Sequence, residues 1–247
     1  MPITFINTTE DEFLRTKMLY RFFPLERALQ CLEGRYLWFA NPLEWHDPFE
    51  RRYFNAIYNI KEYKSRLELP IKNRVVCLCL TKTYSCEAFW TVYARNDIGV
   101  GMSIDKRVLL EILNGLTDCE VYVGACNYMT TKNISNYPAA HPETINGIFN
   151  ETASVSRKLQ MELLLQKRIA FDYEDEFRVI LVRNRKSEAK GEKISFDGHK
   201  LISRLTLDPR IGPETERMMK KALFEKYGIP VAKSHIYTEY KPLEIKI

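Results

Sequence analysis

The 247-residue sequence has no long hydrophobic run. Its longest apolar segments, residues 75–80 and 180–182 with their neighbours, fall far short of the ~20 residues that span a bilayer. The first residues, Met1 to Phe5, lack the basic start and the apolar core of a secretory signal. The sequence therefore predicts a protein without a membrane segment, located in the cytoplasm.

Histidine is scarce, and the sequence has neither a glycine-rich nor a histidine-rich metal-binding loop. His141, His199 and His235 have no partner at the spacing of metal ligands. The six cysteines are diluted in a long chain, and Cys77 and Cys79 sit in an apolar run without a second Cys or His pair. We expect reduced, buried thiols, with no disulfide framework and no metal.

The composition is that of a globular protein, with 45% hydrophobic and 28% charged residues. A net charge of +5 permits polyanionic partners without demanding them. Helical and strand patterns follow each other without strict alternation, which favours an α+β fold over a doubly wound one. We expect a single domain over residues 1–247.

Periodicity and capping signals predict the elements of this domain. Helices are expected from Thr9 to residue 17 and at 24–34, 48–58, 105–114 and 213–227, with another capped by Ser85 and a long one at 144–169 that breaks near Ala153. Strands are expected at 18–23, 36–40, 74–82, 99–104, 120–128, 177–182, 193–196, 204–207 and 235–240. Residues 133–142 are turn-like and are predicted to form a mobile connection.

The most informative segment is the acidic run that precedes the apolar strand 177–182. Four carboxylates lie between Asp172 and Glu176. On a strand, Glu174, Glu176 and Arg178 would point to one face. Two like charges on one face repel each other, so the pair either lies in solvent or lines a site that Arg178 neutralises.

Several motifs resemble an uncharacterised bacterial family labelled domain of unknown function 2971. They are Asn41-Pro42, Asp47-Pro48-Phe49-Glu50, Phe89-Trp90 with Tyr93 and Gly99, and the run from Tyr173 to Arg178. Nearly the whole chain is covered by this resemblance. The sequence departs from the family pattern at His46, Val92 and Phe171, where asparagine, histidine and tryptophan are expected.

The layout is also similar to ADP-ribosyltransferases, whose motif is an arginine on an early strand, a Ser/Thr strand end and a late Glu-x-Glu. Arg21, Thr81 and Glu176 occupy these places in order, with Thr-Lys-Thr where Ser-Thr-Ser is expected. The resemblance implies a mixed or antiparallel central sheet split into two halves with flanking helices. It further implies an NAD-dependent mono-ADP-ribosyltransferase, a glycosyltransferase acting as a bacterial toxin or anti-phage effector on nucleic acid or protein, with a neutralising antitoxin or chaperone as partner.

This chemistry assigns roles to the candidate residues. Glu176 would stabilise the oxocarbenium-like ribose formed when the nicotinamide bond of NAD breaks, and Glu174 would orient or deprotonate the nucleophile. Arg21, next to Tyr20, would hold the pyrophosphate. Thr81 would support Glu176 or the ribose. The last candidates, Trp90 and Tyr93, would form an aromatic wall for nicotinamide or the acceptor.

Other interpretations stay open. Asp47, Glu50, Glu174 and Glu176 could bind Mg²⁺ in a metal-dependent nuclease. The charged loop 183–193 could bind nucleic acid or a partner in a non-catalytic module. On a purely structural interpretation, Arg21 is an ion-pair partner of Glu174 or Glu176. In that interpretation, core or loop anchoring is the role of Trp38, Trp45 and Trp90. His46-Asp47 is the cap of the helix that begins at Pro48.

Overall fold

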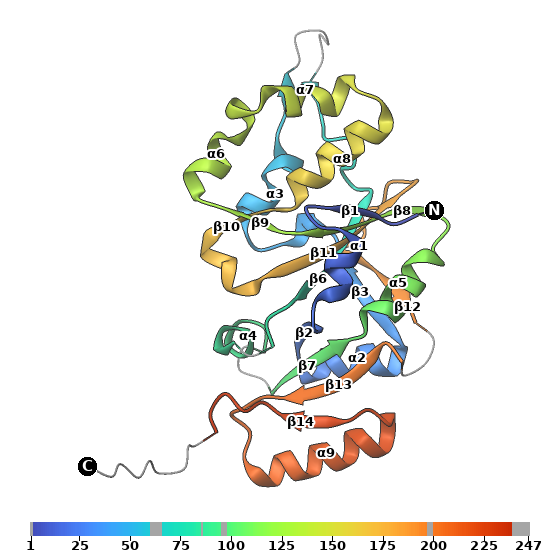
Figure 1. The fold of residues 1–247 in the computed structure, drawn as a ribbon, viewed down its shortest axis with the longest axis vertical. Coiled ribbons are helices and arrows are strands. Elements are labelled where there is room, and N and C mark those ends of the chain that lie inside the picture. Colours follow the sequence, from blue (N-terminus) through green and yellow to red (C-terminus); the bar gives the residue numbers. More distant parts are fainter. Residues whose placement is uncertain (1, 60–65, 85, 95–97, 197–199, 239–247) are drawn as a thin grey trace, which may run out of the picture.

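The computed structural model of the chain describes residues 2–59, 66–84, 86–94, 98–196 and 200–238 (Figure 1). A mixed, ten-stranded sheet forms the centre and is flanked by helices, which confirms the predicted α+β class. Its main path runs β1 (Thr4–Ile6), β8 (Cys119–Ala125), β11 (Glu176–Arg183), β6 (Val75–Thr81), β2 (Leu19–Pro24), β7 (Gly99–Ile104), β13 (Ile202–Leu207) and β14 (Val231–Lys233).

The sheet forks at β6. On one side, β6 pairs antiparallel with β11 over seven residues, from Val75 to Thr81. On the other side, Thr81 pairs with Tyr20 of β2, whereas Cys77 pairs with Ala40 of β3 (Tyr36–Ala40). The branch through β3 continues into β12 (Gly191–Ser195). Two separate branches therefore leave the same edge of β6.

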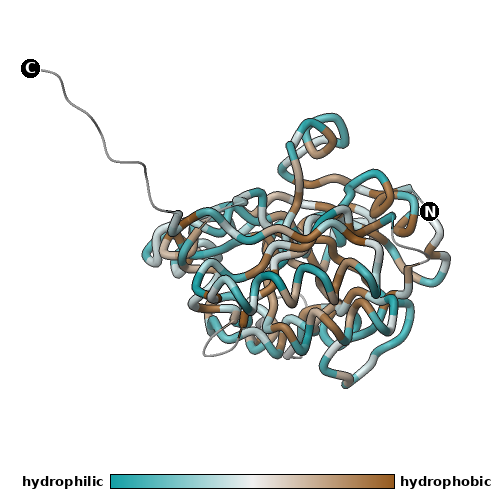
Figure 2. Tube along the Cα trace, turned by 90° about the horizontal axis from the view of Figure 1, so that it is seen from below, coloured by the Kyte–Doolittle hydropathy of each residue, from teal (hydrophilic) through white to brown (hydrophobic). Residues whose placement is uncertain are grey.

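Two hydrophobic cores cover the two faces of the sheet. The first contains Leu78 and Val179 and is closed by α1 (Glu10–Arg15), α2 (Leu25–Gly34), α5 (Lys106–Asn114) and α9 (Pro213–Tyr227). The second contains Cys77 and Ile180 and is closed by α3 (Pro48–Asn55), α7 (Pro142–Asn150) and α8 (Ala153–Leu164). Hydrophobic and hydrophilic residues alternate along the helices at short intervals, as in amphipathic helices that bury one face (Figure 2).

Short elements connect these layers. The helical turns are η1 (Pro42–Glu44) and η2 (Ile169–Glu174), and α4 (Glu87–Val92) and α6 (Thr131–Ala140) are the remaining helices of the described chain. Two small sheets pair β9 (Asn127–Met129) with β10 (Gln166–Arg168) and β4 (Tyr58–Asn59) with β5 (Arg66–Leu67). Within the described ranges, no helix has the length and apolar character needed to cross a bilayer.

Several local predictions are confirmed. Thr9 forms a capping box with Glu12 at the start of α1. The last predicted helix has the expected bounds, and Gly228 ends it with a φ of 66°. The predicted long helix is interrupted near Ala153, where α7 and α8 are separate helices.

Other local predictions are wrong. Residues 133–142, expected to be turn-like, lie mostly in α6, because Thr130 caps this helix through the Asn133 amide and Pro138 comes only in its last turns. The helix from Pro48 ends at Asn55, and the predicted strand 120–128 is divided into β8 and β9.

The C-terminal strand also differs from the prediction. It is β14, parallel to β13, and residues 235–238 form no strand, while 239–240 lie outside the described residues. Ser85, the predicted helix cap, also lies outside the described residues.

Candidate functional site

A cavity of about 450 Å³ opens at the fork of the sheet. Its wall includes five of the predicted site residues: Arg21, Thr81, Tyr93, Glu174 and Glu176. The strand register explains how three of the contributing segments meet, because Thr81 of β6 pairs with Tyr20 of β2 on one side and with Glu176 of β11 on the other. Residues about 60 and 95 positions apart in sequence thus border one cavity.

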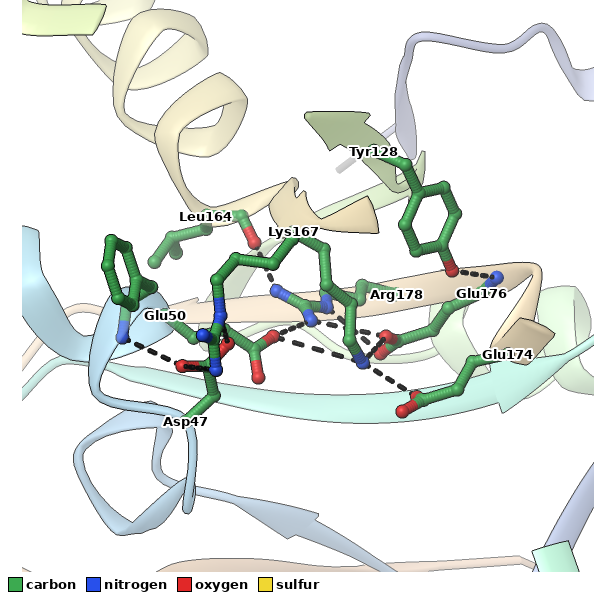
Figure 3. A network of polar contacts seen from close by, with 10 residues as sticks. Asp47, Glu50, Tyr128, Leu164, Lys167, Glu174, Glu176 and Arg178 are labelled. Carbon is green, nitrogen blue, oxygen red and sulfur yellow. Dashed lines mark hydrogen bonds and ion pairs between the residues drawn. The ribbon is translucent and has the colours of Figure 1, made fainter. Parts of the chain in front are cut away.

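The two glutamates share one cation that the sequence motifs do not include. Lys167 of β10 places its Nζ 2.6 Å from Glu174 Oε2 and 2.6 Å from Glu176 Oε2 (Figure 3). Glu174 is the last residue of η2 and not part of the strand, and Asp175, with a φ of 38°, links it to β11. The predicted strand alternation therefore does not relate Glu174 to Glu176; their common contact with Lys167 brings the two side chains together.

Arg178 neutralises Glu176, as the alternation along β11 predicts. Its Nε lies 2.9 Å from Glu176 Oε1 and its Nη2 lies 3.1 Å from Oε2. The same guanidinium binds Glu50 of α3 and lies 4.3 Å from the ring centre of Trp45. Because Arg178 is only 1% exposed, these contacts are shielded from water.

The cluster of Glu50, Lys167, Glu174, Glu176 and Arg178 contains three carboxylates and two cations. Burial opposes ionisation of Glu176, but Arg178 and Lys167 more than offset it and lower the pKa of this carboxyl. Burial raises the pKa of Glu174, and the attraction of Lys167 only partly offsets that effect. With all five groups ionised, one negative charge is left in excess beside the cavity.

Asp47 and Arg168 form a second ion pair next to this cluster. Arg168 donates to both carboxylate oxygens of Asp47, at 2.9 and 3.1 Å. Asp47 also accepts a hydrogen bond from the Phe49 amide at 3.0 Å and so caps α3, as predicted. This pair fixes α3, and therefore Glu50, against β10.

Thr81 acts on the backbone of the acidic segment. Its hydroxyl donates to the main-chain carbonyl of Glu174 and accepts a hydrogen bond from the Thr83 amide at 2.9 Å. The Lys82 amide donates to the Asp175 carbonyl at 3.1 Å. The end of β6 thereby holds the turn that presents Glu174 and Glu176.

Arg21 lies across the fork from the carboxylate cluster. Its Nη1 donates to the Trp38 carbonyl of β3 at 2.8 Å, which links the two branches of the sheet. Among the described residues, no carboxylate lies within 4.0 Å of Arg21, so an ion pair with Glu174 or Glu176 is not present. The cavity therefore has an unneutralised cation on one wall and an excess carboxylate on another.

Of the three predicted aromatic site residues, only Tyr93 lines the cavity. Tyr93 lies near Glu174, and its hydroxyl partly offsets the rise in the pKa of that carboxyl. Trp90 is 2% exposed and packs edge-on against Phe22, so it lies behind the wall. Tyr20 is also absent from the wall and packs against Tyr84 instead. Phe89 and Tyr173 contribute aromatic wall surface that the prediction did not include.

The cysteines are free thiols, as expected, and Cys79 borders the cavity. Burial raises the pKa of Cys79, which disfavours a reactive thiolate. In the part of the chain that the structure describes, no group of three or more His, Cys, Asp and Glu side chains is arranged to hold a metal ion. The carboxylates proposed as Mg²⁺ ligands instead contact Lys167, Arg168 and Arg178.

The fold and the cavity together define an α+β protein whose forked sheet carries a buried charge cluster. A family model described as protein of unknown function (DUF2971) matches residues 89–179. The matched segment includes the Phe89-Trp90 motif and the acidic run up to Arg178, so the predicted resemblance is confirmed there. The motifs at 41–50 precede this segment. No curated protein matches the chain.

Proposed function

We propose that the protein is an NAD-dependent mono-ADP-ribosyltransferase with its active site in the cavity at the fork. The observation that carries this proposal is that Arg21, Thr81 and Glu176, on three adjacent strands, border the same cavity. The two branches that leave β6 are consistent with the divided sheet that the resemblance implies. The volume of about 450 Å³ lies within the range of small-molecule sites.

The electrostatics of the cavity suit this reaction. Breaking the bond between nicotinamide and ribose places positive charge on the ribose, and the excess negative charge of the cluster would stabilise it. Glu176 is kept ionised by Arg178 and Lys167 and would bear most of this role. The guanidinium of Arg21, without a carboxylate partner, would bind the anionic pyrophosphate.

Glu174 and Tyr93 would act on the incoming nucleophile. Burial raises the pKa of Glu174 towards the range that suits a general base. Tyr93, whose hydroxyl lowers the pKa of the Glu174 carboxyl, would orient that carboxylate and provide a ring face beside Phe89. In this assignment Lys167 positions both glutamates without contacting the substrate.

The test is to incubate the protein with NAD labelled on the adenylate and to measure both released nicotinamide and labelled macromolecule. Glu176→Gln keeps the size of the side chain and should lower the rate at least ~10²-fold. Glu225→Gln, which changes an exposed carboxylate on α9 that lines neither cavity, is the matched control and should not change the rate. Equal rates for both variants, with unfolding curves like that of the wild type, would remove Glu176 from the mechanism.

A metal-dependent nuclease is less well supported, because each carboxylate that it would need is already paired with a cation. That alternative predicts nucleic-acid cleavage that EDTA abolishes and that does not require NAD. A toxin or defence role with a neutralising partner belongs to the transferase proposal and depends on it.

A further inference from the structure

A second cavity of about 400 Å³ is lined in part by residues of β6 and of the connection after β3 that adjoin the lining residues of the first cavity in sequence. It is formed by the start of β6 and by the loop between β11 and β12. Its charged lining consists of three arginines, Arg74, Arg183 and Arg185, and two carboxylates, Asp118 and Glu192. The segment 183–193 contains five basic and two acidic residues. With three guanidinium groups against two carboxylates, the wall of this cavity has a net positive charge, which favours an anionic ligand.

Only part of this positive charge is neutralised within the protein. The charge of Arg183 is neutralised, because its guanidinium forms ion pairs with both Glu192 and Asp118. Arg74 donates through Nε to the Arg183 carbonyl at 2.8 Å, and in the described chain no carboxylate lies within 4.0 Å of its guanidinium. Arg185 and Lys186 are exposed and have no ion-pair partner among the described residues either.

The two cavities are lined by residues that are adjacent in the chain. Ala40 lines the first cavity and its neighbour Asn41 lines the second. In β6, Cys77 lines the first cavity and Val76 lines the second. Lys190, in the basic loop, lies 4.0 Å from Glu44, which lines the first cavity. From Cys77 to Arg74 the strand advances by three residues, or about 10 Å. A ligand of a few linked phosphates therefore spans the distance from the basic cavity to the aromatic one.

We propose that the loop 183–193 and the second cavity bind the phosphates of a single-stranded nucleic acid. A single strand fits better than a duplex, because a base must leave its stack to enter the first cavity. There Phe89, Tyr93 and Tyr173 offer ring faces for stacking. If the proposed function is correct, on which this last step rests, single-stranded nucleic acid is also the acceptor of ADP-ribose.

Binding is tested without NAD, by fluorescence anisotropy of a labelled 20-nucleotide single-stranded DNA and an RNA of the same sequence over a range of salt concentrations. The variant with Arg185→Gln, Lys186→Gln and Lys190→Gln changes only exposed side chains. It should bind at least ~10-fold more weakly, and its salt slope should fall by about 0.7 for each phosphate that the variant no longer neutralises.

The matched control removes three basic side chains from the outer surface of α9, at Arg217, Lys220 and Lys221. It should bind within twofold of the wild type. Equal weakening by both triple variants, or tighter binding of a duplex or a phosphopeptide than of the single strand, would overturn the proposal. Arg74→Gln, which changes a residue of the cavity wall, should also weaken binding of the single strand.

The outcome also separates this inference from the proposed function. Nicotinamide release is measured on the wild-type protein alone. If no nicotinamide is released but the loop variant loses binding, the transferase proposal fails and the nucleic-acid site stands. If NAD is cleaved and the loop variant binds normally, the nucleic-acid site fails and the transferase proposal stands.

Discussion

Replacing Lys167 by methionine tests the buried charge cluster directly, whatever the function of the protein. Methionine preserves most of the side-chain volume and removes only the ammonium group. Glu176 would keep Arg178 as its partner, but Glu174 would lose the cation that lies 2.6 Å away. The predicted result is a large loss of stability without a change of fold.

The magnitude follows from the geometry. At an effective dielectric constant of about 20, a contact of 2.6 Å corresponds to about 6 kcal/mol of attraction. The cost of removing the ammonium from water offsets much of this attraction, and loss of one partner of a buried pair typically destabilises a protein by about 3–5 kcal/mol. We expect Lys167→Met to lower the free energy of unfolding by that amount at pH 8.

The loss should depend on pH with a definite sign. Burial already raises the pKa of Glu174, and removing Lys167 raises it further. A carboxyl whose pKa is higher in the folded than in the unfolded state contributes stability that is complete below the unfolded value and is lost as the pH rises through the folded value. The deficit of Lys167→Met should therefore be smaller at pH 5 than at pH 8.

Urea unfolding curves at both pH values measure these differences, provided that the slopes agree between variants. Lys82→Met is the control, because Lys82 also lies 2.6 Å from a carboxylate, that of Asp175, but its side chain is 33% exposed. An exposed pair contributes at most about 1 kcal/mol. If the two variants lost equal stability, or if the deficit of Lys167→Met grew at pH 5, the described cluster would be wrong.

Two further predictions use the same unfolding curves. Glu50→Gln should cost less than Lys167→Met, because it removes the excess negative charge and leaves Glu176 as a partner of Arg178; a larger loss would contradict this charge count. Gly124→Ala should cost about 1–3 kcal/mol, since a Cβ there would lie 2.3 Å from Leu165 Cδ1 in a filled core; an unchanged midpoint would show that Leu165 can move away freely.

Much of the fold follows from local sequence signals. The apolar runs of β6 and β11 and the caps at Thr9 and Gly228 are strong patterns that act within a few residues. The helix α6 is not predicted from the sequence, because its Asn, Ser and Pro residues are typical of turns. The cap at Thr130 is a local signal for this helix, whereas the burial of Ile134 and the packing of Tyr137 against the second core depend on tertiary contacts.

The same distinction between local signals and tertiary contacts applies to the site residues. The acidic run and Arg178 are visible in sequence, because alternation along one strand relates Glu176 to Arg178. The role of Lys167 is not visible in sequence, because this residue comes from the separate strand β10 and meets Glu174 only through the turn at Asp175. A polar triplet, Gln166-Lys167-Arg168, directly after three leucines is the one signal that could have drawn attention to it.

The cost of this cluster is itself an argument for a function. Buried ion pairs rarely stabilise a protein more than apolar residues of similar volume would, so five buried charges are a poor way to hold a sheet together. Here they border a cavity, and their charges do not cancel.

On another wall of this cavity, Arg21 has no carboxylate partner among the described residues. A cavity with an excess negative charge on one wall and a free cation on another fits a ligand that is itself cationic at one end and anionic at the other. NAD, with its nicotinamide ring and its pyrophosphate, is such a ligand.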